Sequence, residues 1–290
     1  MRLAAKWRRA VERDYLKVAG WDVEPLILGG DHPEAIRLGD GEPIVIVPGM
    51  AGGWRLVAPL AARLADCGFE AIICGLRGDG SALVPANRIQ SVADLAADLG
   101  RLIETMRLER PTVLGISFGG AVALEWAVAR PHRLGGLVLH GVDSRFEPNV
   151  GSMVTRHVLE RFPLPSNNLF LNQFFNILHG CKPEPGPLVD FVIERCWETD
   201  QSVVAQRLRA LEEFDVTERL ERIDAPTLVL GGSRDVVVPT KRQQVLARSI
   251  PGARFIGLEG AGHIGFLTHA EETVRHVTRH VRAGSLALHG

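Results

Sequence analysis

The chain has 290 residues, of which 46% are hydrophobic and 23% are charged, with 31 glycines and 17 prolines. This length and composition are typical of a globular protein with a large core, and they exclude collagen-like, coiled-coil and disordered chains. Lysine and arginine total 33 against 34 for aspartate and glutamate, so the formal net charge is −1. We expect no nucleic-acid partner, because the chain lacks a global positive charge that would attract phosphate backbones.

The first twenty residues predict an amphipathic surface helix over residues 1–20. They hold no unbroken apolar stretch of the kind a secretory signal needs, and no run in the chain approaches the length of a membrane span. We expect this helix to dock onto the body of the protein or a partner, with a membrane surface as the alternative. The four cysteines occur without a CxxC pair, which favours free thiols in the cytoplasm. The apolar residues at helical intervals are Leu3, Trp7, Ala10, Val11 and Tyr15.

Short apolar runs rich in β-branched residues alternate with longer runs rich in alanine and leucine over most of the chain. Such nearly continuous apolar strands must be covered on both faces, which predicts an α/β fold with a mostly parallel sheet between two helical layers. We assign this core to residues 21–143 and 219–282. Strands are predicted at 43–47, 69–74, 112–116, 137–140, 227–230 and 253–258, and helices at 56–67, 92–106, 121–129 and 241–249.

The alternation stops between residues 144 and 218. This segment contains 7 of the 11 phenylalanines, a proline cluster and helical patterning on either side of it. We interpret it as a helical cap inserted into the core, with its aromatic rings packed over the open end of the sheet. The rings either line an apolar substrate pocket or hold the cap together. Residues 283–290 are expected to form a loose tail. The candidate pocket residues are Phe162, Phe170, Phe174, Phe175 and Phe191.

A Gly-x-Ser-x-Gly motif lies where a predicted strand meets a predicted helix. The motif is Gly115-Ile116-Ser117-Phe118-Gly119. A serine nucleophile in such a turn needs small neighbours, because its strained backbone comes close to adjacent elements. The motif and its context predict Ser117 as a nucleophile, and the alternative is a glycine- and serine-containing turn without reactivity.

A serine hydroxyl is a poor nucleophile at neutral pH, so it needs a general base and a carboxylate that orients the base. His263 follows the last predicted strand in a glycine-rich loop and is the preferred base, with His269 as its nearby rival. Asp235 follows the strand at 227–230 and gives the chain order Ser, Asp, His. Asp143, just beyond another strand, is the alternative acid.

These motifs resemble those of the α/β-hydrolase family, specifically its cap-bearing serine esterase-like members, over residues 43–281. The resemblance implies two backbone N–H donors for an oxyanion, those of Phe118 and Met50. Relatives usually have histidine where this chain has Pro48, and a proline cannot orient the Met50 loop through an imidazole. The loop that begins with Arg77 looks like the family's Arg-Gly-His-Gly-x-Ser loop with Asp79 in the histidine position, and we expect Asp79 to be structural.

The resemblance favours a serine hydrolase that cleaves a carboxylic ester of an apolar acyl or aromatic small molecule through an acyl-enzyme. Carbon–carbon hydrolysis, lactone or thioester hydrolysis and perhydrolysis can use the same three residues, and a non-catalytic ligand-binding receptor is a further alternative. A carbon–carbon hydrolase with a charged substrate would need a buried arginine, for which Arg195 and Arg207 are candidates. We expect no cofactor and no metal, since HExxH-type spacing is absent. The sequence leaves open whether the chain forms a homo-oligomer.

Overall fold

A computed structural model of the protein describes residues 35–79, 89–148, 150–162 and 176–289, so the predicted helix at 1–20 lies outside the described residues. Its centre is a seven-stranded sheet with the order β1-β3-β2-β4-β5-β6-β7. β1 runs antiparallel to β3 and the other strands pair in parallel, which confirms the predicted α/β fold with a mostly parallel sheet. The strands are β1 Ala35–Leu38, β2 Glu42–Val47, β3 Phe69–Cys74, β4 Thr112–Ile116, β5 Gly136–His140, β6 Thr227–Gly232 and β7 Arg254–Leu258.

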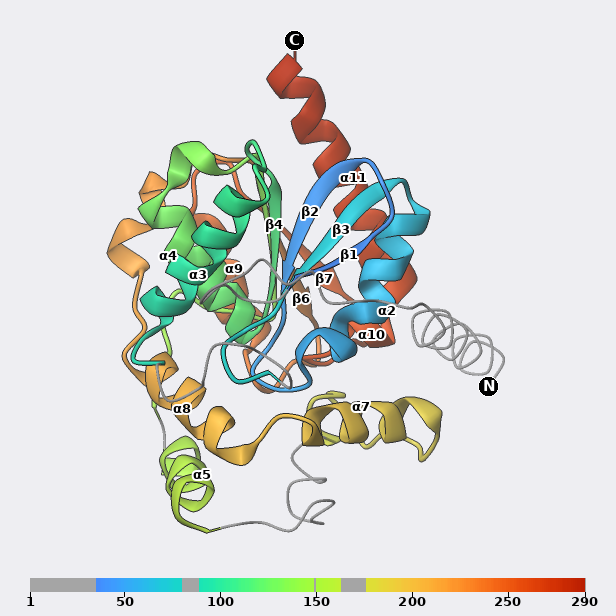
Figure 1. The fold of residues 1–290 in the computed structure, drawn as a ribbon. Helices are drawn as coiled ribbons and strands as arrows, with labels where there is room; N and C mark the ends of the chain where they lie inside the picture. The colour runs from blue at the N-terminus through green and yellow to red at the C-terminus, as the bar shows by residue number, and fades with distance from the viewer. Residues whose placement is uncertain (1–34, 80–88, 149, 163–175, 290) are drawn as a thin grey trace.

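Helices cover both faces of this sheet (Figure 1). None of the helices in the described ranges has a stretch sufficiently long and apolar to span a membrane. The expected loose tail is corrected by the structure, because the last helix continues to His289. One face carries α2 Gly53–Asp66, α10 Gly265–Thr268 and α11 Ala270–His289, and the other carries α3 Val92–Thr105, α4 Phe118–Ala129 and α9 Thr240–Ser249.

The continuous apolar character of the strands is explained by two hydrophobic clusters, one on each face of the sheet. In β2, Val45 and Val47 belong to the cluster under α3 and α4. Ile44 and Ile46 alternate with them and belong to the cluster under α2 and α11. Successive strand residues point to opposite faces of the sheet. The strand can therefore bury all four side chains only if both helical layers are present.

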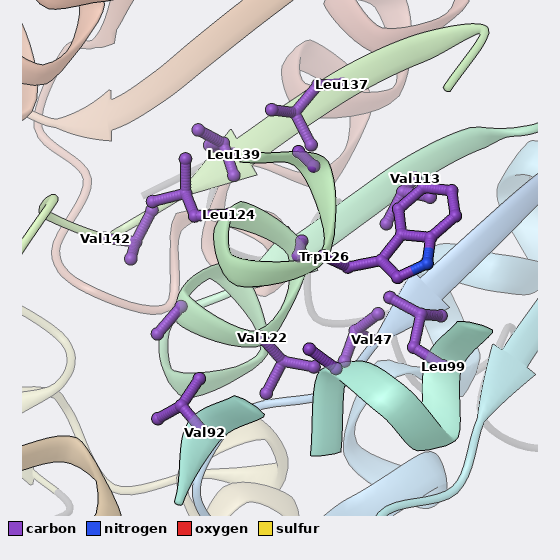
Figure 2. Close-up of a cluster of buried hydrophobic side chains, with 14 of the residues drawn as sticks. Val47, Val92, Leu99, Val113, Val122, Leu124, Trp126, Leu137, Leu139 and Val142 are labelled. Atoms are coloured by element: carbon purple, nitrogen blue, oxygen red, sulfur yellow. The ribbon is translucent and has the colours of Figure 1, made fainter. Parts of the chain in front are cut away.

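Figure 2 shows how α3 and α4 close the first of these clusters, with Trp126 of α4 lying beside Leu99 of α3 and Val113 of β4. α3 begins at a capping box, in which the Ser91 hydroxyl accepts a hydrogen bond from the Asp94 N–H and the Asp94 carboxylate accepts one from the Ser91 N–H. These bonds satisfy backbone donors that the first turn of a helix leaves free, so they fix where α3 starts.

The segment between β5 and β6 forms helices that lie outside the two helical layers (Figure 1). Its two ends pair in a short antiparallel bridge between Arg145 and Asp215, and the Val216 N–H donates to the Ser144 carbonyl. The segment therefore leaves and rejoins the core at one narrow neck. Its helices are α5 Val150–Arg161, α7 Pro187–Trp197 and α8 Gln201–Glu212, followed by a 3-10 helix at Thr217–Arg222.

The packing of α3 onto the sheet predicts a large loss of stability on truncation of Leu99. Leu99 is fully buried, so Leu99→Ala removes apolar contacts and leaves a cavity, at a cost of about 2–5 kcal/mol. Glu104→Ala, on the exposed side of the same helix, is the matched control and should change stability by about 0.5 kcal/mol or less. Urea denaturation measures both values, and equal effects of the two substitutions would contradict this packing.

Candidate active site

The strand order reverses beside β4, and this reversal creates a crevice at one edge of the sheet. β2 pairs with β3 on one side and with β4 on the other, with Val47 of β2 opposite Gly115 of β4. The loops that leave the carboxyl ends of β2 and β4 therefore diverge to opposite faces, and such a switch point is where open α/β sheets bind ligands. Ser117 directly follows β4, and residues 48–52 directly follow β2.

Ser117 occupies a strained turn between β4 and α4. Its φ of 52° and ψ of −117° are unusual for a residue with a side chain, and its N–H donates to the His140 carbonyl at 2.8 Å. Two residues later, a Cβ on Gly119 would lie 2.2 Å from the Val47 carbonyl oxygen, so only glycine fits there. Strain of this kind persists where surrounding contacts impose it. Here the strained turn makes the Ser117 side chain project from the start of α4.

His263 comes from the loop after β7, which lies three strands away from β4 in the sheet. Neighbouring strands are about 4.8 Å apart, so this loop must cross about 14 Å to reach Ser117. The crossing passes directly over the end of β6, where a Cβ on Gly232 would lie 2.3 Å from the Gly262 carbonyl oxygen. The loop brings His263 Nε2 to 2.8 Å from Ser117 Oγ.

Asp235 holds the other nitrogen of this imidazole. Its Oδ2 lies 2.9 Å from His263 Nδ1, and its Oδ1 accepts hydrogen bonds of 2.9 Å from the N–H groups of Val237 and Val238. Gln243 Nε2 also donates to Oδ2, at 3.2 Å. Burial acts to raise the pKa of Asp235, but the hydrogen bonds from His263 and the two backbone N–H groups outweigh it and hold that pKa below its ordinary value.

The two rival residues from the sequence analysis have other partners. Asp143 Oδ2 lies 3.3 Å from an Arg242 nitrogen, in an ion pair between the loop after β5 and α9. His269 Nδ1 lies 2.9 Å from the Thr268 hydroxyl. The structure therefore brings together Ser117, His263 and Asp235, and it places Asp143 and His269 in separate local contacts.

A second histidine, His140 at the end of β5, is buried beside this constellation. Its ring packs edge-on against Phe266, with centroids 5.7 Å apart, and neither ring nitrogen has a hydrogen-bond partner in the described structure. Burial, followed by the proximity of His263, lowers the pKa of His140 to about 4. His140 is therefore uncharged at neutral pH and adds no positive charge beside the imidazole that faces Ser117.

The loop after β2 contains Met50 and is held by an arginine from α8. The side chain of Arg207 is fully buried, and its guanidinium donates to the carbonyl oxygens of Met50 and Arg77, both at 2.8 Å. It also donates to Asp79 Oδ1 at 2.7 Å, while Asp79 Oδ2 accepts the Leu76 N–H at 3.1 Å. One buried ion pair thus ties the Met50 loop and the Asp79 loop to the inserted segment.

The support that Arg207 gives to the Met50 loop is a functional feature that could not be predicted from the sequence. The sequence shows that two histidines usual in the family are replaced by Pro48 and Asp79, and it names Arg207 only as a candidate for binding a charged substrate. In the structure, Asp79 and Arg207 neutralise each other, and the guanidinium contacts the backbone next to Met50. The signal available in the sequence was Asp79 itself, a carboxylate at a loop position where the family usually has histidine. A buried carboxylate at such a position needs a cation as its partner.

The inserted segment also contacts the loop that carries the imidazole. The Ile264 N–H donates to the Leu178 carbonyl at 3.2 Å. The backbones of His179 and Gly262 pack so closely that a Cβ on Gly262 would lie 2.2 Å from the His179 carbonyl carbon. On the other side, the Gly52 N–H donates to the Thr199 hydroxyl at 3.0 Å. The inserted segment therefore supports the loops after β2 and after β7, on both sides of Ser117.

The aromatic residues expected to line a pocket have different surroundings. Phe162, the residue after α5, is 55% exposed. Phe191 of α7 is buried in the cluster shared with α2, and the Arg195 guanidinium lies 5.9 Å from its ring centroid. Burial of this kind is what we expect of a ring that holds the insertion against the core. Phe170, Phe174 and Phe175 lie outside the described residues.

The arrangement around Ser117 can move a proton. The hydroxyl can pass its proton to His263 Nε2 as its oxygen attacks an electrophile, and the ionised Asp235 stabilises the imidazolium that forms. Phe118 is the first residue of α4, and the loop that contains Met50 comes close to the serine, since a Cβ on Gly49 would lie 3.7 Å from Ser117 Cβ. No group of three or more His, Cys, Asp or Glu side chains in the described ranges is arranged to hold a metal ion.

The buried pair of Asp79 and Arg207 predicts strong energetic coupling. Either Asp79→Ala or Arg207→Met leaves one buried charge without its partner, and each should cost about 3–5 kcal/mol. The double variant removes both charges, so its loss of stability should be well below the sum of the single losses. Urea denaturation of the four proteins measures the coupling, and additive losses would show that the two side chains do not depend on each other.

Two relatives named as hydrolases are similar to this chain over most of its length. A protein of Variovorax paradoxus (strain S110) named as a carbamate hydrolase is 27% identical over 259 residues, which cover 82% of this chain and 91% of that protein. A 2-hydroxy-6-oxo-6-phenylhexa-2,4-dienoate hydrolase of Comamonas testosteroni is 26% identical over 248 residues, covering 81% of this chain and 85% of that protein.

Solved structures and a family description extend this likeness to most of the chain. An esterase from Exiguobacterium antarcticum superposes with a TM-score of 0.78 at 23% identity, covering 90% of this chain and 98% of that chain, which shows a shared fold. The family described as "alpha/beta hydrolase fold" matches residues 42–270, from β2 to the start of α11. The chain therefore belongs to the α/β-hydrolase family.

Proposed function

We propose that this protein is a serine hydrolase that cleaves a carboxylic ester of a small molecule through an acyl-enzyme intermediate. The observation that carries this proposal is the unbroken hydrogen-bond chain from Ser117 Oγ to His263 Nε2 at 2.8 Å and from His263 Nδ1 to Asp235 Oδ2 at 2.9 Å. Such a chain activates a hydroxyl that would otherwise be a weak nucleophile.

The reaction has two halves in this proposal. Ser117 Oγ attacks the acyl carbon while His263 takes its proton, and the imidazolium then gives that proton to the departing alcohol. The backbone N–H groups of Met50 and Phe118 stabilise the negative charge that develops on the carbonyl oxygen. In the second half, His263 removes a proton from water as the water attacks the acyl carbon, and the imidazolium returns that proton to Ser117 Oγ as the bond to the acyl group breaks and the acid departs.

An ester with an apolar acyl or aromatic group is the substrate class we favour. The inserted segment would act as the cap over the site, because it contacts the loops on both sides of Ser117 through Arg207, Thr199 and Leu178. Similarity to an esterase structure and to a named carbamate hydrolase supports acyl transfer in general. Lactones, thioesters, carbamates, carbon–carbon bonds and perhydrolysis are alternatives, since the same three side chains serve each of them.

Replacement of Ser117 tests the nucleophile. Ser117→Ala removes the attacking oxygen, so hydrolysis of p-nitrophenyl acetate, butyrate and octanoate should fall by roughly 10⁴-fold or more. Ser249→Ala, at an exposed serine near the end of α9, is the control and should retain wild-type rates. Activity that survives Ser117→Ala would disprove the nucleophile. Tight binding of an ester without turnover by the wild type would favour the ligand-binding receptor.

Two matched substitutions separate the candidate acids. Asp235→Asn should lower kcat by about 10³- to 10⁴-fold, because the carboxamide cannot orient the imidazole or stabilise its charge as a carboxylate does. Asp143→Asn breaks only the ion pair with Arg242 and should change kcat by less than about twofold. Steady-state kinetics on the same esters distinguish the two, and the opposite ranking would transfer the role to Asp143.

A further inference from the structure

A glutamine from α9 contacts the carboxylate that orients His263. The side chain of Gln243 is fully buried. Its Nε2 donates to Asp235 Oδ2 at 3.2 Å and to the Val238 carbonyl oxygen at 2.7 Å. Because both of these partners are acceptors, they fix the amide nitrogen, rather than the amide oxygen, toward Asp235.

The other end of this carboxamide is left without a partner. Gln243 Oε1 is buried and accepts no hydrogen bond in the described structure, and a Cβ on Gly231 would lie 2.7 Å from it. A buried acceptor without a donor destabilises a fold. The unpartnered oxygen therefore does not account for a glutamine at this position, and its specific contacts are those of the amide nitrogen with Asp235 Oδ2 and the Val238 carbonyl oxygen.

That donor competes with the imidazole for one oxygen. Asp235 Oδ2 accepts from both His263 Nδ1 and Gln243 Nε2, while Oδ1 already accepts two backbone N–H groups. A second donor on Oδ2 disperses its negative charge and restricts rotation of the carboxylate. A carboxylate with less charge on the shared oxygen stabilises an imidazolium less strongly.

We propose that Gln243 is a positioning residue. Its amide keeps Asp235 Oδ2 facing His263 Nδ1 and, by sharing that oxygen, reduces the stabilisation that the carboxylate gives to the protonated imidazole. This inference rests on the proposed function for its kinetic consequence, but its geometric basis is the shared oxygen. The titratable groups that the structure places against His263 are Asp235 and the buried His140, together with the Ser117 hydroxyl. Arg242, next to Gln243 in α9, pairs with Asp143 and Glu147 instead.

The test compares Gln243→Met with Gln244→Met. Methionine has the length of glutamine and no donor, and Gln244 is the next residue of the same helix, only partly buried. The acid limb of the pH profile of kcat/KM should move to higher pH by about one unit in Gln243→Met, with about tenfold lower kcat/KM at pH 6 and near wild-type values at pH 9. Gln244→Met should keep the wild-type profile, and KM should change little in both.

A second readout does not depend on turnover. The titration midpoint of the His263 ring, followed by NMR in the Ser117→Ala background, should shift upward with Gln243→Met and stay in place with Gln244→Met. This result would stand even if no ester were hydrolysed, so it separates a failure of the inference from a failure of the proposed function. Gln243→Met relieves the buried Oε1 but also leaves the Val238 carbonyl without its Gln243 donor, so thermal unfolding is measured alongside, and Gln243→Leu provides a second donorless variant.

An unmoved His263 midpoint in the donorless variants would overturn the proposal. The same holds for a loss of activity that is uniform across pH, or that only follows a lower unfolding temperature, because either result would indicate a packing role. An upward shift in both the kinetic limb and the ring titration, absent from Gln244→Met, supports it.

Discussion

The whole site depends on the loop after β7 crossing the carboxyl ends of two strands to reach the strained turn after β4. A parallel sheet places all these strand ends at one edge, but its spacing of about 4.8 Å per strand keeps β7 far from Ser117. The crossing is feasible because Gly232, at the end of β6, leaves room for the backbone of Gly262. His263 then lies within hydrogen-bond distance of both Ser117 and Asp235.

Each loop around Ser117 is held by a partner from another element. Arg207 of α8 fixes the loop after β2, the backbone near Leu178 fixes the loop after β7, and Gln243 of α9 contacts the carboxylate after β6. Two of these partners belong to the inserted segment. A segment that completes the support of both flanking loops cannot move away as a rigid body without releasing them, so the insertion and the site form one structural unit.

The sequence predicted the parts of the structure that have a local pattern. Nearly continuous apolar runs gave the parallel strands within a residue or two, and the Gly-x-Ser-x-Gly turn gave the position of Ser117. β1 was missed because it is a short edge strand with the exposed Arg37. The start of α4 was predicted at residue 121 instead of Phe118, since glycines at the elbow mask the helical pattern. The loose tail expected at residues 283–290 was wrong, because α11 continues to His289.

Contacts between distant segments could not be predicted in this way. Nothing near Arg207 in the sequence specifies Met50 and Asp79 as its partners, and nothing near Gln243 specifies the oxygen it contacts.

Covalent labelling tests most directly whether these contacts activate the serine. Mass spectrometry after treatment with a fluorophosphonate should find one adduct on Ser117 in the wild type and almost none in His263→Ala. Labelling that is absent from the wild type, or equal in His263→Ala, would contradict the account.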